Sequence, residues 1–173
     1  KKKNENWVVP FPPKHVLTYH TEFFTGKNYL PLSGISKSKT LHCNENDYWA
    51  IFKSDRYGLN NDDKVWDSKI AAILLGDSYT MGACVNSDEN ISGHLKKLNM
   101  KTLNLGYGGN GPLIELATLI EYAPLVNTKK ILWLFSNNDL DDLNIEKTSS
   151  LLTNYLEKKL SLNIYKNQSE IDN

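Results

Sequence analysis

Cysteine, excess charge and long apolar runs are all scarce in this sequence of 173 residues. Its two cysteines, Cys43 and Cys84, are accompanied by no Cys-x-x-Cys or His-x-x-x-His pattern, which excludes the usual zinc sites. Lysine plus arginine and aspartate plus glutamate both number 20, and the zero formal net charge argues against a nucleic acid partner. No apolar stretch approaches the ~20 residues that span a bilayer. The length suits one domain with a real core.

The first third of the chain has no clear periodicity. Pro12 and Pro13 exclude a helix there, and short strands are predicted at 7–9, 16–19 and 48–52. We expect residues 1–66 to form an irregular layer packed on a core that residues 67–173 provide.

From residue 67 onward, apolar runs alternate with helical patterns. Strands are predicted at 69–75, 102–105 and 130–135. Helices are predicted at 88–99, from Pro112 to about Pro124, and at 149–160. This alternation predicts an α/β fold of the flavodoxin-like, three-layer αβα type with a mostly parallel sheet.

Each of the three predicted strands ends in a turn rich in small or polar residues. The turns are Gly76-Asp77-Ser78-Tyr79-Thr80, Gly106–Pro112 and Ser136-Asn137-Asn138-Asp139. Because parallel strands place their carboxyl ends at one edge, we expect the three turns to meet. A serine hydroxyl there can act as a nucleophile if a base and oxyanion donors converge on it; otherwise Ser78 is a helix-capping serine. The flanking Asp77 and Asp139 are expected to bond backbone N–H groups in their turns.

These three turns resemble, in order, the first three motifs of the SGNH (GDSL-type) hydrolases. The resemblance covers roughly residues 54–160, and Ser54–Asn61 is similar to a segment of bacterial SGNH proteins that acylate or deacylate envelope polysaccharides. It implies that Ser78 is the nucleophile, and that the Ser78 and Gly109 N–H groups and the Asn138 side chain bind the oxyanion. The implied substrate is a small acyl ester or an O-acetylated carbohydrate, and no metal or organic cofactor is implied.

The fourth family motif, Asp-x-x-His, is absent from this sequence. None of His15, His20, His42 and His94 has an aspartate three residues before it. The resemblance therefore implies a general base beyond residue 173, and we expect this chain to be the N-terminal part of a longer domain that is nearly inactive alone. Its open sheet edge could pair with a second copy.

Two other functions remain open at this stage. One is a non-catalytic SGNH-like module that binds a glycan or a protein. The other is nucleotide binding, because Gly106–Gly111 fits G-x-G-x-x-G between a strand and a helix, although no acidic residue follows at the expected place.

The cysteines bear on location. If the chain is periplasmic or otherwise exported, a Cys43–Cys84 disulfide could tie the N-terminal segment to the turn that carries Ser78. In the alternative, a cytoplasmic protein, the two cysteines would be small buried hydrophobes.

Overall fold

A three-stranded parallel sheet lies at the centre of the molecule. The structure is a computed structural model that describes residues 7–9, 31–45, 47–158 and 160–172. The strands are β4 (Ala72–Leu75), β5 (Thr102–Asn104) and β6 (Ile131–Trp133), in the order β5-β4-β6. In register, Ile73 lies beside Leu103 on one side and Ile131 on the other. The first strand in sequence thus lies between the second and the third, as in flavodoxin-like sheets.

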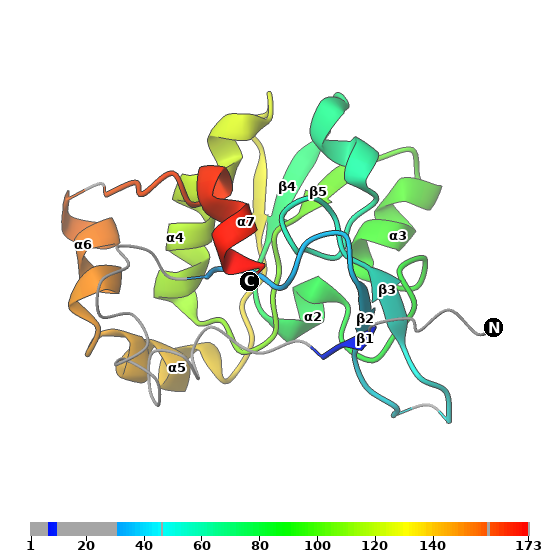
Figure 1. Cartoon of the computed structure of the whole chain (residues 1–173), viewed down its shortest axis with the longest axis horizontal. Helices are drawn as coiled ribbons and strands as arrows, with labels where there is room; N and C mark the ends of the chain where they lie inside the picture. The colour runs from blue at the N-terminus through cyan, green and yellow to red at the C-terminus, as the bar shows by residue number, and fades with distance from the viewer. Residues whose placement is uncertain (1–6, 10–30, 46, 159, 173) are drawn as a thin grey trace.

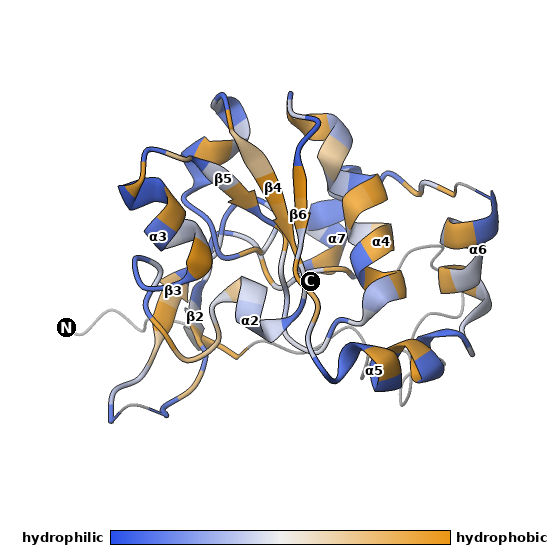
Figure 2. Cartoon of the chain, turned by 180° about the vertical axis from the view of Figure 1, so that it is seen from behind, coloured by the Kyte–Doolittle hydropathy of each residue, from blue (hydrophilic) through white to orange (hydrophobic). Residues whose placement is uncertain are grey.

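Helices cover both faces of this sheet. Figures 1 and 2 show α3 on one side of the strands and α4 on the other, which gives the predicted three-layer α/β fold. The helices are α2 (Ser78–Met81), α3 (Ile91–Lys97), α4 (Pro112–Tyr122), α5 (Asp139–Glu146), α6 (Ser150–Lys158) and α7 (Gln168–Ile171). Single turns of 3-10 helix are η2 (Asp63–Asp67), η3 (Ala123–Leu125) and η4 (Ile164–Asn167).

Sequence patterns predicted the larger elements better than the short ones. Pro112 occupies the first turn of α4, and the helix ends two residues before Pro124, as expected. The predicted strands and the other two predicted helices are present but are shorter than their sequence patterns. The helices α2 and α5, which begin in the turns after β4 and β6, were not predicted.

A second small sheet is built from the N-terminal part of the chain. It contains β1 (Trp7–Val8), β2 (Lys39–Leu41) and β3 (Ile51–Lys53); β1 is parallel to β2, and β3 is antiparallel to it. The strands predicted at 7–9 and 48–52 correspond to β1 and β3, and β2 was missed. The strand predicted at 16–19 lies outside the described residues.

One hydrophobic cluster joins the two sheets. Leu32, Phe52 and Trp66 from the N-terminal part are buried in the same cluster as Ile73 and Ile114 from the α/β part. Residues 31–66 therefore complete the core of a single packed unit.

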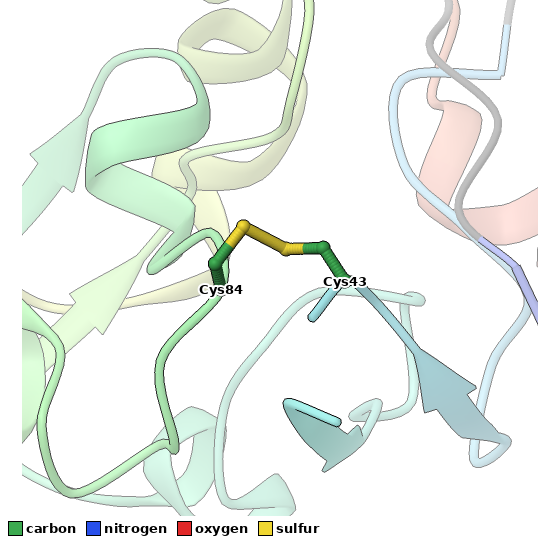
Figure 3. Close-up of a disulfide and its surroundings, with 2 residues drawn as sticks. All are labelled: Cys43 and Cys84. Atoms are coloured by element: carbon green, nitrogen blue, oxygen red, sulfur yellow. A yellow bond between two sulfur atoms is a disulfide. The ribbon is translucent and has the colours of Figure 1, made fainter. Parts of the chain in front are cut away.

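A disulfide adds a covalent link between the two parts. Cys43 follows β2, Cys84 follows α2, and their Cα atoms are 5.0 Å apart (Figure 3). The pairing that the sequence allowed is thus present. In the described part of the chain, no helix has the length and apolar character needed to cross a membrane.

Candidate active site

Ser78 is the first residue of α2, immediately beyond the carboxyl end of the central strand β4. The Asp77 side chain caps this helix by accepting a hydrogen bond of 2.9 Å from the Tyr79 N–H. The turn leaves no room at Gly76, where a Cβ would lie 2.2 Å from Thr80 Oγ1 and 2.8 Å from the Leu134 carbonyl oxygen. Ser78 itself is half-buried, and its hydroxyl bonds to nothing within the described residues.

The turn after β5 lies against Ser78. A Cβ placed on Gly108 would be 3.8 Å from Ser78 Cβ, so the two turns are in van der Waals contact range. Gly109 has a φ of +79°, a conformation that favours glycine. Within the described residues, the backbone N–H groups of Ser78 and Gly109 donate no hydrogen bond. Both donors are therefore available to a ligand oxygen.

The turn after β6 is connected to the first turn through Asp77. Ser136 Oγ lies 2.8 Å from Asp77 Oδ2 and 2.7 Å from Asn138 Oδ1. The side-chain amide of Asn138 donates to Asp142 at 3.0 Å, and its Nδ2 lies 3.5 Å from Asp77 Oδ2. The structure thus brings Asn138 to the site, but its amide hydrogens face carboxylates.

Asp77 and Asp139 have the expected local roles. Asp77 caps α2, and Asp139 accepts a bond of 2.7 Å from the Ser136 N–H. Sequence reasoning missed Ser136, which contacts both carboxylates. The available signal was its place as the first polar residue after the apolar run of β6.

A cavity of about 340 Å³ opens between the turns that follow β4 and β6. It is lined by Asp77, Tyr79, Leu134, Phe135, Ser136, Asn137 and Asn138. Tyr79 and Phe135 are 72% and 65% exposed. The strand order reverses direction between β4 and β6, and open α/β sheets bind ligands in the crevice at such a switch point.

A buried carboxyl group, Glu115, lies close enough to Asp77 and Asp139 to interact with them electrostatically. Glu115 on α4 accepts a hydrogen bond from Trp133 Nε1, and its other oxygen has no partner among the described residues. Burial raises the pKa of Glu115 to about 8, and the nearby Asp139 and Asp77 carboxylates add to the shift. Sequence reasoning missed this group, because glutamate is common on the exposed face of a helix.

A second buried carboxyl group belongs to Glu146, the last residue of α5. It lies at the N-terminus of α4. Its two oxygens accept bonds of 2.8 Å from the backbone N–H groups of Gly111 and Leu113. Burial raises its pKa to about 7, and these backbone donors oppose the shift. A dinucleotide would need the same N–H groups for its phosphates. In the G-x-G-x-x-G segment and the start of α4, these N–H groups are therefore already bonded to the Glu146 carboxyl, which argues against nucleotide binding.

No described histidine hydrogen-bonds to Ser78. His42 is half-buried beside Phe52, and burial lowers its pKa; His94 is exposed on α3. His15 and His20 lie outside the described residues.

The Ser54–Asn61 segment is hydrogen-bonded to the ends of α2 and β5 next to the site. Asn61 makes two hydrogen bonds to the backbone of Asn104 at the end of β5, at 2.8 and 2.9 Å. Asn60 donates to the Met81 carbonyl oxygen at 2.9 Å, which holds the end of α2. Asp55, fully buried, receives Trp66 Nε1 and the Asn61 amide, and so orders the segment itself.

Comparisons with protein-family models, curated proteins and solved structures found no match to this chain. The described residues also contain no group of three or more histidine, cysteine or acidic residues placed to hold a metal ion. The geometry of the three turns is therefore what indicates a function.

Proposed function

We propose that this protein is a serine-dependent acyl-ester hydrolase in which Ser78 is the nucleophile. One observation carries the proposal: Ser78, whose N–H and that of Gly109 are unengaged within the described residues, lies between Asp77 and Tyr79, two residues that line a cavity at the switch point of a parallel sheet. A hydroxyl and an N–H pair at such an edge are what acyl transfer requires.

In this proposal the oxyanion is bound by the N–H groups of Ser78 and Gly109 and by the Asn138 side chain. The backbone groups need no rearrangement. The Asn138 amide must turn away from Asp142 to reach the oxyanion, so its contribution depends on how firmly Asp142 holds it.

The general base is a histidine from outside the described residues, since neither His42 nor His94 contacts the serine. Without it, attack by Ser78 is slow, because a neutral hydroxyl is a weak nucleophile. The substrate is a small acyl ester or an O-acetylated carbohydrate, in hydrolysis or transfer, and no cofactor takes part. The exposed rings of Tyr79 and Phe135 suit the apolar face of a sugar or an acyl group.

We further propose that the protein acts in the periplasm or another exported compartment. The Cys43–Cys84 disulfide supports this location, because cytosolic thiols are kept reduced.

The alternative is a non-catalytic SGNH-like module that binds a glycan or a protein. The same cavity would then hold a ligand without reaction. The absence of a histidine bonded to Ser78 within the described residues favours this alternative.

Labelling with a fluorophosphonate separates the two functions, because it reports the reactivity of the serine without full turnover. In the full-length protein, which supplies the histidine, we expect intact mass and peptide mapping to show one adduct, on Ser78, and p-nitrophenyl acetate hydrolysis to fall to the uncatalysed rate in Ser78→Ala. Ser161→Ala is the matched control, since Ser161 is exposed and outside the site. Equal labelling and equal hydrolysis in Ser78→Ala and the unaltered protein would remove the assigned role.

A further inference from the structure

A second cavity, of about 320 Å³, lies beside β5, between residues 60–68 and α3. Its volume is at the lower end of the range of small-ligand pockets, roughly 300–1,000 Å³. Within the described part of the chain, no residue lines both this cavity and the one next to Ser78. The two cavities are therefore separate sites.

The chain itself occupies the edge of β5 next to this cavity. Asn61 accepts a hydrogen bond from the Asn104 N–H and donates one to the Asn104 carbonyl oxygen, so its side chain engages both backbone groups of that residue. A further strand could pair with β5 at Asn104 only by displacing Asn61. The cavity therefore depends on no free strand edge, because residues 60–102 form its walls.

Hydrogen bonds hold the buried polar side chains of the cavity in place. Asn60 accepts a hydrogen bond of 3.0 Å from Ser87 Oγ, and Asn90 accepts one of 2.7 Å from the Gly93 N–H. Both asparagines are only 4% exposed. A ligand would thus meet a wall whose geometry is already set, which lowers the entropic cost of binding.

Three lysines from different parts of the chain line the cavity: Lys64 on η2, Lys96 on α3 and Lys101 before β5. Within the described residues, none of them forms an ion pair. Asp62 supplies the single carboxylate of the lining, and this carboxylate accepts from the Lys64 N–H at 3.1 Å. The cavity thus has an excess of positive charge in a chain whose formal net charge is zero, and it favours an anion.

The lining favours an acidic sugar over an inorganic anion. Among the described residues that line the cavity none is an arginine, the side chain that binds phosphate with two parallel donors. The Gly93 N–H in the first turn of α3 is already bonded to Asn90 and is not available to a phosphate. Separate lysines, together with the hydroxyl groups of Ser87 and Ser92, suit a ligand that carries one charge and several hydroxyl groups.

We propose that this cavity binds a small sugar that carries a carboxylate, such as a uronate unit. The lysine ammonium groups neutralise the carboxylate, and the serine hydroxyls bond to the hydroxyl groups of the ring. Val65, a buried residue of the lining, offers an apolar contact to the ring. The inference is independent of the catalytic proposal, because it uses no residue of the three turns.

An NMR titration of the isotope-labelled full-length protein with glucuronate tests the site. We expect saturable shifts of the Ser92 and Gly93 amide signals, and binding of glucose that is weaker by about tenfold or more because it lacks the charge. Lys96→Glu with Lys101→Glu should raise the dissociation constant for glucuronate by a similar factor, because two of the three positive charges are reversed.

The matched control is Lys147→Glu with Lys158→Glu, which changes the net charge equally at exposed positions outside the cavity and should bind normally. Circular dichroism checks that each variant keeps its fold. The absence of saturable shifts, or equal binding of glucuronate and glucose, would overturn the site. Inorganic phosphate that binds as tightly as glucuronate would reduce it to a general anion site and refute the assignment to a sugar. A cavity variant that binds as well as the control would place the ligand elsewhere.

Discussion

The side-chain nitrogen of Asn138 lies 3.0 Å from Asp142 Oδ2, so the amide proposed for the oxyanion already has an anionic acceptor. A donor engaged in this way must exchange one charged partner for another when the tetrahedral intermediate forms. Asp142, buried in the first turn of α5, therefore competes with the oxyanion for the Asn138 amide in the proposed site.

This relationship predicts opposite effects for two substitutions. Asn138→Ala should lower kcat/KM for p-nitrophenyl acetate by roughly 10²–10³, the usual loss for one oxyanion donor. Asp142→Ala should leave kcat/KM equal or higher, because the amide is released. Asn127→Ala, at an exposed position, is the control. If Asn138→Ala behaved like the control, the amide would have no part in the reaction.

The pKa of Glu115 predicts how stability depends on pH. A carboxyl whose pKa rises to about 8 on folding binds its proton more tightly in the folded state. Its contribution is complete below the unfolded value of ~4.3 and is lost as pH rises through 8, at about 1.4 kcal/mol per pKa unit. Urea unfolding between pH 4 and 9 should show this decline. A residual slope is expected from Glu146, whose pKa is about 7.

Glu115→Gln should remove much of that decline. Its amide oxygen can still accept from Trp133 Nε1, but no charge is buried above pH 8. We expect the variant to be more stable than the unaltered protein at pH 9 and to differ little at pH 4. Equal stability at pH 9 would mean that Glu115 ionises without cost.

Glu146 should behave differently from Glu115, because both of its oxygens are used. An amide can accept from only one of Gly111 and Leu113, and its NH₂ group would oppose the other donor. Glu146→Gln should therefore lower the free energy of unfolding by about 1–3 kcal/mol at pH 8. Glu157→Gln, exposed on α6, is the control and should change it little.

The disulfide predicts a large effect of reduction. It joins residues 41 positions apart, and the loop-closure entropy removed from the unfolded chain corresponds to about 4 kcal/mol. Denaturant unfolding with and without a phosphine reductant measures this difference. Cys43→Ser with Cys84→Ser should match the reduced protein, and an unchanged midpoint would contradict the entropic account.

The sequence predicted the sheet and the place of Ser78 because both depend on local patterns. Apolar runs such as Ile70–Leu75 mark buried strands, and a polar turn after each run must lie at the sheet edge. The approach of Gly108 to Ser78 and of Asn138 to Asp77 followed from parallel strand direction alone.

The sequence did not reveal which acidic side chains are buried. Asp139, Asp142 and Glu146 form the polar side of α5 and resemble a solvated loop in sequence, yet all three are buried. Their burial depends on contacts with α4 and with the β6 turn, which are distant in the chain. The strand β2 was missed for a similar reason, since three residues carry too little periodicity.

The helix α2 has only four residues and would not be stable in water by itself. The direction of the Ser78 side chain therefore depends on contacts from other parts of the chain. Asn60 and Asn104 donate hydrogen bonds to backbone carbonyl oxygens of α2. The disulfide at Cys84 links the chain just beyond α2 to the N-terminal part. Grafting Gly76–Thr80 into another scaffold would transfer the residues of the motif but not the orientation of the Ser78 side chain. Redesign of this centre would have to carry the distant asparagines and the second sheet along with it.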